Sequence, residues 1–185
     1  MASAREAALA RRSSSKVTDA APEHDALMAL LEAAARVADH ASLRPWRVIA
    51  LRGAARERLG RALAAAAGVD GDAAAKLAAK PLRAPLLLAI VAVTMPGHPK
   101  VPEWEQEASA AGVAHLLSLL LDEAGWGVMW RTGPHTRHPI VAEMHGLAPN
   151  EHLLGWLYVG GLPAGTRTER RPERLAAARL TTLDA

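Results

Sequence analysis

The stretch LLLAIVAVT occupies residues 86–94, and its first eight residues form the longest uninterrupted apolar run in the chain. A strand with one face in water alternates apolar and polar side chains, whereas an unbroken apolar run indicates a strand buried on both faces. The run is also too short to cross a bilayer as a helix. We therefore expect a central strand in the core of a protein that has no membrane partner.

Helices and further strands are predicted on both sides of this run. Apolar residues at helical spacing predict helices over residues 27–35, 54–67 and 103–124, with a short helix around 141–145. β-prone segments predict strands at 46–51, 128–131 and 153–159. Residues 69–85 read as a polar, alanine-rich connection and residues 95–102 as a loop. Long helices before the first strand favour an α+β arrangement over a doubly wound sheet.

The composition indicates a single domain over residues 1–185, half of whose residues are hydrophobic. The chain has no cysteine, which excludes disulfides, a thiolate nucleophile and a cysteine-ligated metal centre. We expect a cytoplasmic protein that begins with a short helix within residues 1–10. Residues 162–185 lack a clear hydrophobic period and are interpreted as a tail, with an arm on a partner subunit as one possibility.

The net charge of +3 raises the question of nucleic-acid binding. The densest basic run, residues 167–174, contains Glu169 and Glu173, as a solvated tail would. Nucleic-acid binding therefore stays a minor alternative. His135 and His138 resemble a metal pair, but prolines bracket them and no carboxylate lies near in sequence, so no metal is expected.

The segment RRSSSK at residues 11–16 has the side chains of a phosphate site. Guanidinium groups donate to phosphate oxygens in pairs, and serine hydroxyls fill the remaining acceptor positions. A flexible, solvated terminal segment is the competing interpretation. The chain contains neither GxGxxG nor GxxxxGK[ST], so any nucleotide would be held by side chains.

Five segments together resemble one enzyme family. They occur in this order along the chain: RRSSSK (11–16), ARVADHASLRPW (35–46), KVPEWEQE (100–107), GWGVMWRTG (125–133) and GWLYVGG (155–161). Their order and spacing resemble the FMN-dependent nitroreductase family, in particular its small single-domain branch, from about Arg11 to Gly161. The resemblance implies a homodimer with an α+β sandwich, a central, mostly antiparallel sheet flanked by helices, and two FMN molecules at the subunit interface.

The resemblance also implies where the cofactor binds. The residues expected to hold the FMN phosphate and ribityl chain are Arg11, Arg12, Ser13 and Arg131, with Trp130 and Thr132 beside them. Those expected from the opposite subunit are Arg36 and His40, with Ser42 as a further ligand on the same loop. Lys16 is the candidate for the positive charge near the flavin N1, although it lies one position later than in many family members.

The reaction implied by the resemblance is a two-step hydride transfer. NADH or NADPH would deliver hydride to the flavin N5, and the flavin would then reduce a small electron-poor acceptor such as a nitroaromatic or quinone. The cofactor carries this chemistry, so no catalytic side chain is expected. The alternatives are a flavin-binding module and a flavin-dependent relative that acts on a substrate without a nitro group.

Overall fold

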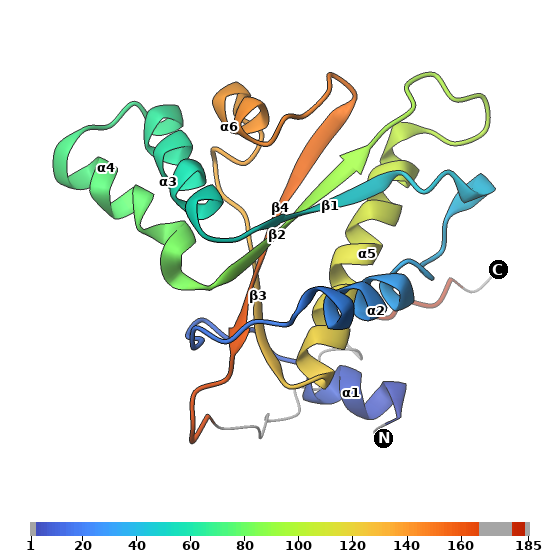
Figure 1. Ribbon diagram of the computed structural model, residues 1–185. Helices are drawn as coiled ribbons and strands as arrows, with labels where there is room; N and C mark the ends of the chain where they lie inside the picture. Colours follow the sequence, from blue (N-terminus) through green and yellow to red (C-terminus); the bar gives the residue numbers. More distant parts are fainter. Residues whose placement is uncertain (1–2, 167–178, 184–185) are drawn as a thin grey trace.

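A computed structural model describes residues 3–166 and 179–183 of the chain (Figure 1). In this part of the chain, one antiparallel sheet has the strand order β1-β2-β4-β3, formed by β1 (Trp46–Leu51), β2 (Leu86–Val93), β3 (Trp126–Arg131) and β4 (Glu151–Gly161). The α-helices are α1 (Ala4–Ala10), α2 (His24–Ala34), α3 (Ala54–Ala67), α4 (Gly71–Ala78), α5 (Glu103–Glu123) and α6 (Pro139–Met144). Two 3-10 turns are η1 (His40–Ser42) and η2 (Lys80–Arg83).

Strand β2 is the centre of the core, as its sequence predicts. It pairs with β1 on one side and β4 on the other, and only Val93 of its residues is not fully buried. Successive side chains of a strand point to opposite faces of the sheet. Leu86, Leu88 and Ile90 therefore pack in a cluster with α2 and α5, while Leu87, Ala89 and Val91 pack in a second cluster with α3 and α6.

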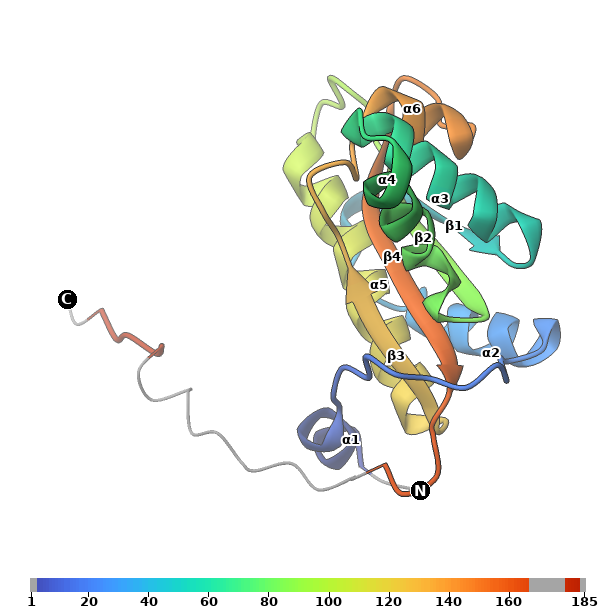
Figure 2. The same ribbon diagram turned by 90° about the vertical axis from the view of Figure 1, so that its left-hand side faces the viewer.

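The two clusters give the molecule its layers. Figures 1 and 2 show α5 along one face of the sheet and α3 and α6 at the other, with α4 packed beside α3. On α5, the buried Val113, Leu117 and Leu121 recur every four residues and form one apolar stripe. Full burial of each such side chain contributes about 1.5–3 kcal/mol.

The predicted helices and strands agree with the structure to within about three residues, but the connection at residues 69–85 does not. This segment contains helix α4 and the turn η2. Alanine dominates α4, so Leu77 alone provides a large apolar side chain and the helical period is hard to detect. The proposed arm within residues 162–185 falls largely on positions 167–178 and 184–185, which lie outside the described residues.

The segment after α1 crosses the end of the sheet at β3 and β4. The main-chain N–H of Ser14 donates to the carbonyl of Val128 at 2.8 Å, and that of Thr18 donates to the carbonyl of Gly161 at 2.8 Å. A Cβ at Gly160 would lie 2.6 Å from the carbonyl oxygen of Thr18, so this crossing requires glycine in the strand. The crossing places the RRSSSK segment beside β3.

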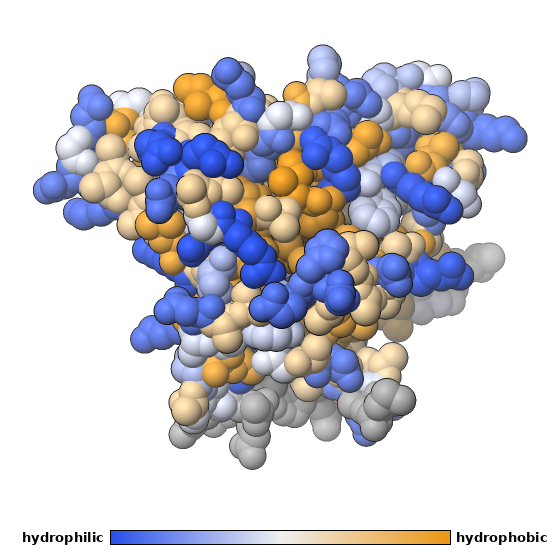
Figure 3. Space-filling view, viewed as in Figure 1, coloured by the Kyte–Doolittle hydropathy of each residue, from blue (hydrophilic) through white to orange (hydrophobic). Residues whose placement is uncertain are grey.

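The surface is of mixed character. Figure 3 shows apolar side chains near the middle of the face seen in Figure 1, with hydrophilic side chains around them. Within residues 3–166 and 179–183, no helix is long and apolar enough to cross a membrane.

Two glycines within helices should respond to alanine in opposite ways. A Cβ at Gly60 in α3 would lie 2.9 Å from the Cα of Ala78, whereas a Cβ at Gly112 in α5 would make an ordinary 3.5 Å contact with Val37. Alanine favours a helix over glycine by about 1 kcal/mol. We expect Gly112→Ala to raise the free energy of unfolding by about 0.5–1 kcal/mol and Gly60→Ala to lower it by about 1–3 kcal/mol.

Urea denaturation of both variants measures this difference. Equal stabilisation by the two substitutions would contradict the close approach of α3 and α4.

Candidate functional site

The C-terminal end of β3 opens into a cleft of about 490 Å³. Its wall is formed by side chains from the sheet, α3, α4, η2 and the loop after β3: Leu63, Leu77, Lys80, Arg83, Met129, Trp130, Arg131, Thr132, Gly133, Pro134, His135, Thr136, Trp156 and Tyr158. The described residues that line it include three lysine or arginine side chains and no carboxylate. Such a wall favours an anionic ligand with an apolar portion.

Among the described residues that line the cleft, Arg131 has a buried donor that the protein itself does not satisfy. It is the last residue of β3, and its guanidinium carbon lies 5.2 Å from the centre of the Tyr158 ring. Its Nε is buried and has no hydrogen-bond partner among the described residues. A buried donor without an acceptor destabilises the protein, so an acceptor bound in the cleft would complete this site.

Tyr158 forms part of the floor beneath Arg131. Burial raises the pKa of this phenol to about 12, although the positive charges of Arg131 and Arg83 act in the opposite direction. The hydroxyl therefore stays protonated at neutral pH and is a neutral hydrogen-bonding group.

Trp130 and Thr132 flank Arg131 but have different surroundings. The Trp130 ring makes an edge-on contact with His115 of α5 at 5.0 Å, and its Nε1–H donates to the carbonyl of Leu154 at 3.2 Å. Its indole thus packs toward α5, while Arg131 lies over Tyr158, because neighbouring strand residues face opposite ways. Thr132 is exposed after the strand ends.

The RRSSSK segment lines a second groove, of about 410 Å³, together with the described part of the tail. The groove residues are Arg12, Ser13, Ser14, Ser15, Lys16, Pro163, Ala164, Gly165 and Thr166, again without a carboxylate in this described set. Burial raises the pKa of Asp122 on α5, and a main-chain hydrogen bond from Arg12 and the charges of Arg11 and Arg12 oppose that rise. Asp122 therefore ties this segment to the end of α5.

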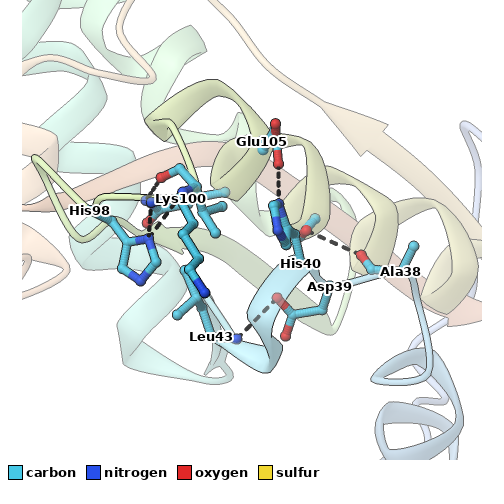
Figure 4. A network of polar contacts seen from close by, with 10 residues as sticks. Ala38, Asp39, His40, Leu43, His98, Lys100 and Glu105 are labelled. Carbon is cyan, nitrogen blue, oxygen red and sulfur yellow. Dashed lines mark hydrogen bonds and ion pairs between the residues drawn. The ribbon is translucent and has the colours of Figure 1, made fainter.

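Arg36, His40 and Ser42 lie on the exposed connection between α2 and β1. Figure 4 shows the turn around His40, whose Nδ1 lies 2.8 Å from Oε2 of Glu105. Three residues of this turn, Ala41, Ser42 and Arg44, have left-handed backbone angles, with φ of 61°, 54° and 48°. Residues other than glycine adopt this conformation at a cost of about 1 kcal/mol each, and such strain is concentrated at functional sites.

Helix α5 contacts all three groups of predicted residues. Along it, Glu105 meets His40, His115 meets Trp130 and Asp122 meets Arg12. Glu105 and Asp122 are 17 positions apart in one helix, which corresponds to about 25 Å. Within one chain, the structure thus places the RRSSSK segment at the C-terminal end of α5, Trp130 of β3 near the middle of this helix, and the His40 turn near its N-terminal end.

Sequence reasoning missed Lys80 and Arg83, which join Arg131 in the wall of the cleft. In the sequence, these two residues form a basic pair three positions apart beside Pro81. This pair could have indicated an anion site, but it lies in the segment interpreted as a connection. Glu105 and Gln106, in the first turns of α5, were also not among the predicted site residues, although both side chains bond to other loops.

The described residues contain no group of three or more histidine, cysteine, aspartate or glutamate side chains arranged to hold a metal. His135 and His138 stack edge-on, with ring centres 6.3 Å apart.

Comparison with known proteins identifies the family to which this chain belongs. Residues 8–161 match the sequence profile of the nitroreductase family. The chain is 38% identical over 153 residues to an Escherichia coli K12 protein named "Putative NAD(P)H nitroreductase YdjA", covering 81% of this chain and 83% of that one. The chain belongs to the nitroreductase family of oxidoreductases.

Solved structures show the same fold. A nitroreductase-like family protein from Bacillus cereus superposes with a TM-score of 0.83 at 23% identity, covering 100% of this chain and 98% of the other. The FMN and NADPH-dependent nitroreductase NfnB from sphigopyxis sp. strain HMH superposes with a TM-score of 0.73 at 20% identity over 100% of both chains. The α+β fold expected from the sequence is confirmed.

Trp156 of the cleft wall makes a pH-sensitive contact with His145, which lies behind it. His145 is buried, its Nδ1–H donates to the carbonyl of Val141 at 2.7 Å, and its Nε2 accepts from Nε1–H of Trp156 at 3.1 Å. This pairing requires a neutral ring. Burial lowers the pKa of His145 below its usual value of 6.5, with Arg47 acting in the same direction and the Val141 hydrogen bond opposing it.

Because the folded pKa is depressed, the unfolded chain binds more protons at mildly acid pH. The contribution of His145 to the free energy of unfolding should be fully present above about pH 6.5. It should fall as the pH drops below this value toward the pKa of His145 in the folded protein. We expect His145→Gln to be less stable at pH 7.5 but to lose less stability between pH 7.5 and 5. Urea denaturation across this pH range measures the free energy of unfolding of both proteins. An equal loss between pH 7.5 and 5 in the unmodified protein and in His145→Gln would contradict the role of His145.

Proposed function

We propose that this protein is an FMN-dependent NAD(P)H oxidoreductase that reduces a small electron-poor acceptor, such as a nitroaromatic compound or a quinone. The buried, unsatisfied Nε of Arg131, in a wall rich in basic side chains, carries this proposal among the described residues. A phosphate monoester bears nearly two negative charges and several acceptor oxygens. Membership in the nitroreductase family and the FMN and NADPH dependence named for NfnB support the same cofactor.

One elongated ligand can reach both basic sites. Ser14 bonds to Val128, and Val128 precedes Arg131 by three residues of β3, which spans about 10 Å. Arg12, Ser13 and Lys16 would hold one part of the cofactor with Arg131, and Lys80 and Arg83 add positive charge to the cleft. A cofactor with a phosphate and a ring system matches this combination of cationic and apolar walls.

Bound FMN would supply the chemistry, by accepting hydride from NADH or NADPH and passing reducing equivalents to the acceptor. The side chains then have binding and electrostatic roles. Arg131, Lys80 and Arg83 neutralise negative charge on the ligand, and the apolar Leu63 and Leu77 exclude water from the cleft. No nucleophile or general base is required from the chain.

A second copy of the chain would complete the site. His40 contacts Glu105, which lies about 25 Å along α5 from Asp122 and its contact with Arg12. His40 and Arg12 of one chain therefore cannot contact the same phosphate. We propose a homodimer in which the His40 turn of one subunit reaches the cofactor held by its partner.

Replacing Arg131 should weaken cofactor binding far more than replacing a surface arginine. Arg131→Ala removes a charge-assisted contact to the cofactor, so we expect the dissociation constant for FMN to rise about 10- to 100-fold. Arg58→Ala, on the exposed side of α3, is the matched control and should leave binding unchanged. Fluorescence titration of the apoprotein with FMN measures the dissociation constant of each variant. Equal dissociation constants for Arg131→Ala and Arg58→Ala would contradict the role of Arg131.

Mixed dimers test whether two chains share each site. Arg131→Ala and His40→Ala homodimers should both bind FMN weakly. A heterodimer of the two variants would contain one site with both defects and one site with neither. Co-expression with two affinity tags should therefore recover a dimer that binds up to one FMN with wild-type affinity. Heterodimers that bind FMN only as weakly as the Arg131→Ala and His40→Ala homodimers would contradict a site shared between two chains.

A further inference from the structure

The turn that carries His40 is fixed to the start of α5 by two contacts. Oγ of Ser109 donates to the carbonyl of Ala38 at 3.1 Å, and the His40 ring bonds to Glu105 (Figure 4). The carboxylate of Asp39 adds order within the turn, since it accepts the main-chain N–H groups of Leu43 and Arg44 at 3.2 and 2.7 Å. The strained backbone of this turn is thus held in one conformation.

Glu105 is itself precisely placed, because its neighbour anchors the first turns of the helix. Gln106 is 1% exposed, and its side-chain oxygen accepts the main-chain N–H of Met95 at 2.7 Å. Its side-chain NH₂ donates to the carbonyls of Met95 and Val101 at 3.2 and 2.9 Å. These bonds fix the rotation of the helix start, and with it the position from which the Glu105 side chain extends.

The contact with Glu105 determines which nitrogen of His40 carries hydrogen. An ionised carboxylate only accepts hydrogen bonds, so Nδ1 of His40 must donate at 2.8 Å. In the neutral ring, Nε2 is then an acceptor on the side away from Glu105. The His40 side chain is 54% exposed, so its ring is accessible to a ligand. An exposed pair of this kind contributes little to folding, so stability alone does not explain it.

We propose that Glu105 is a positioning residue that holds His40 in the Nδ1–H tautomer. In this state Nε2 accepts a hydrogen bond from a donor on the cofactor bound to the partner subunit, such as a ribityl hydroxyl. The inference rests on the proposed function for its ligand, but the tautomer is a property of the protein alone. Glu105 acts through His40 and does not touch the cofactor.

The tautomer can be measured without any ligand. Nitrogen-15 NMR of the ligand-free protein at pH 8 should show His40 protonated at Nδ1. Glu105→Ala should shift His40 to the Nε2–H form, which a histidine side chain favours in water, and Glu105→Gln should retain Nδ1–H because its amide oxygen still accepts. Glu103→Ala is the matched control, with the same charge removed from the same helical turn. An Nε2–H tautomer in the unmodified protein would overturn the proposal.

Cofactor binding provides the second readout. We expect Glu105→Ala to weaken FMN binding about five-fold, Glu105→Gln to restore most of the affinity, and Glu103→Ala to have no effect. His40→Ala combined with Glu105→Ala should bind no more weakly than His40→Ala alone. If the double variant instead loses FMN affinity by the product of the two single-variant effects, Glu105 does not act through His40. Failure of the unmodified protein to bind FMN would instead contradict the proposed function, while the NMR result would still report on Glu105.

Discussion

The burial of β2 on both faces is the constraint on which the rest of the structure depends. Its alternate side chains, Leu86, Leu88 and Ile90 on one face and Leu87, Ala89 and Val91 on the other, all need apolar partners. A single helical layer leaves one of these sets in water, so helices must cover both faces. The pairing of β2 with β1 and β4 then leaves β3 at the edge, where Arg131 ends the strand beside the cleft.

Helix α5 connects the packing of the core to the candidate site. One stripe of the helix packs against β2, and other positions along its length contact the three segments that the nitroreductase resemblance implicates in cofactor binding. A helix is a rigid spacer, so the distances among these segments are set by the positions of Glu105, His115 and Asp122. The length of α5 also separates His40 from Arg12, and this separation is the physical reason why the proposed site requires two chains.

The sequence was sufficient to predict the elements whose apolar pattern is strong. The unbroken run of β2 and the spacing of leucines on α5 gave correct positions, because burial decides both patterns. Helix α4 was missed because alanine gives a weak period. The cleft could not be predicted, since Lys80 and Arg83 meet Arg131 only through the folding of η2 beside the sheet. The contact between His40 and Glu105 likewise joins residues 65 positions apart, and no local pattern indicates it.

The visible absorption spectrum of the purified protein, before and after anaerobic addition of NADPH or NADH, shows whether the chain binds a flavin that a nicotinamide reduces. We expect a flavin spectrum, obtained on purification or after FMN is supplied, that bleaches when the nicotinamide is added. A flavin that binds but stays oxidised with both nucleotides would indicate a flavin-binding module or a different electron donor. If the protein takes up no flavin from added FMN, it is not an FMN-dependent oxidoreductase and the proposed function is wrong.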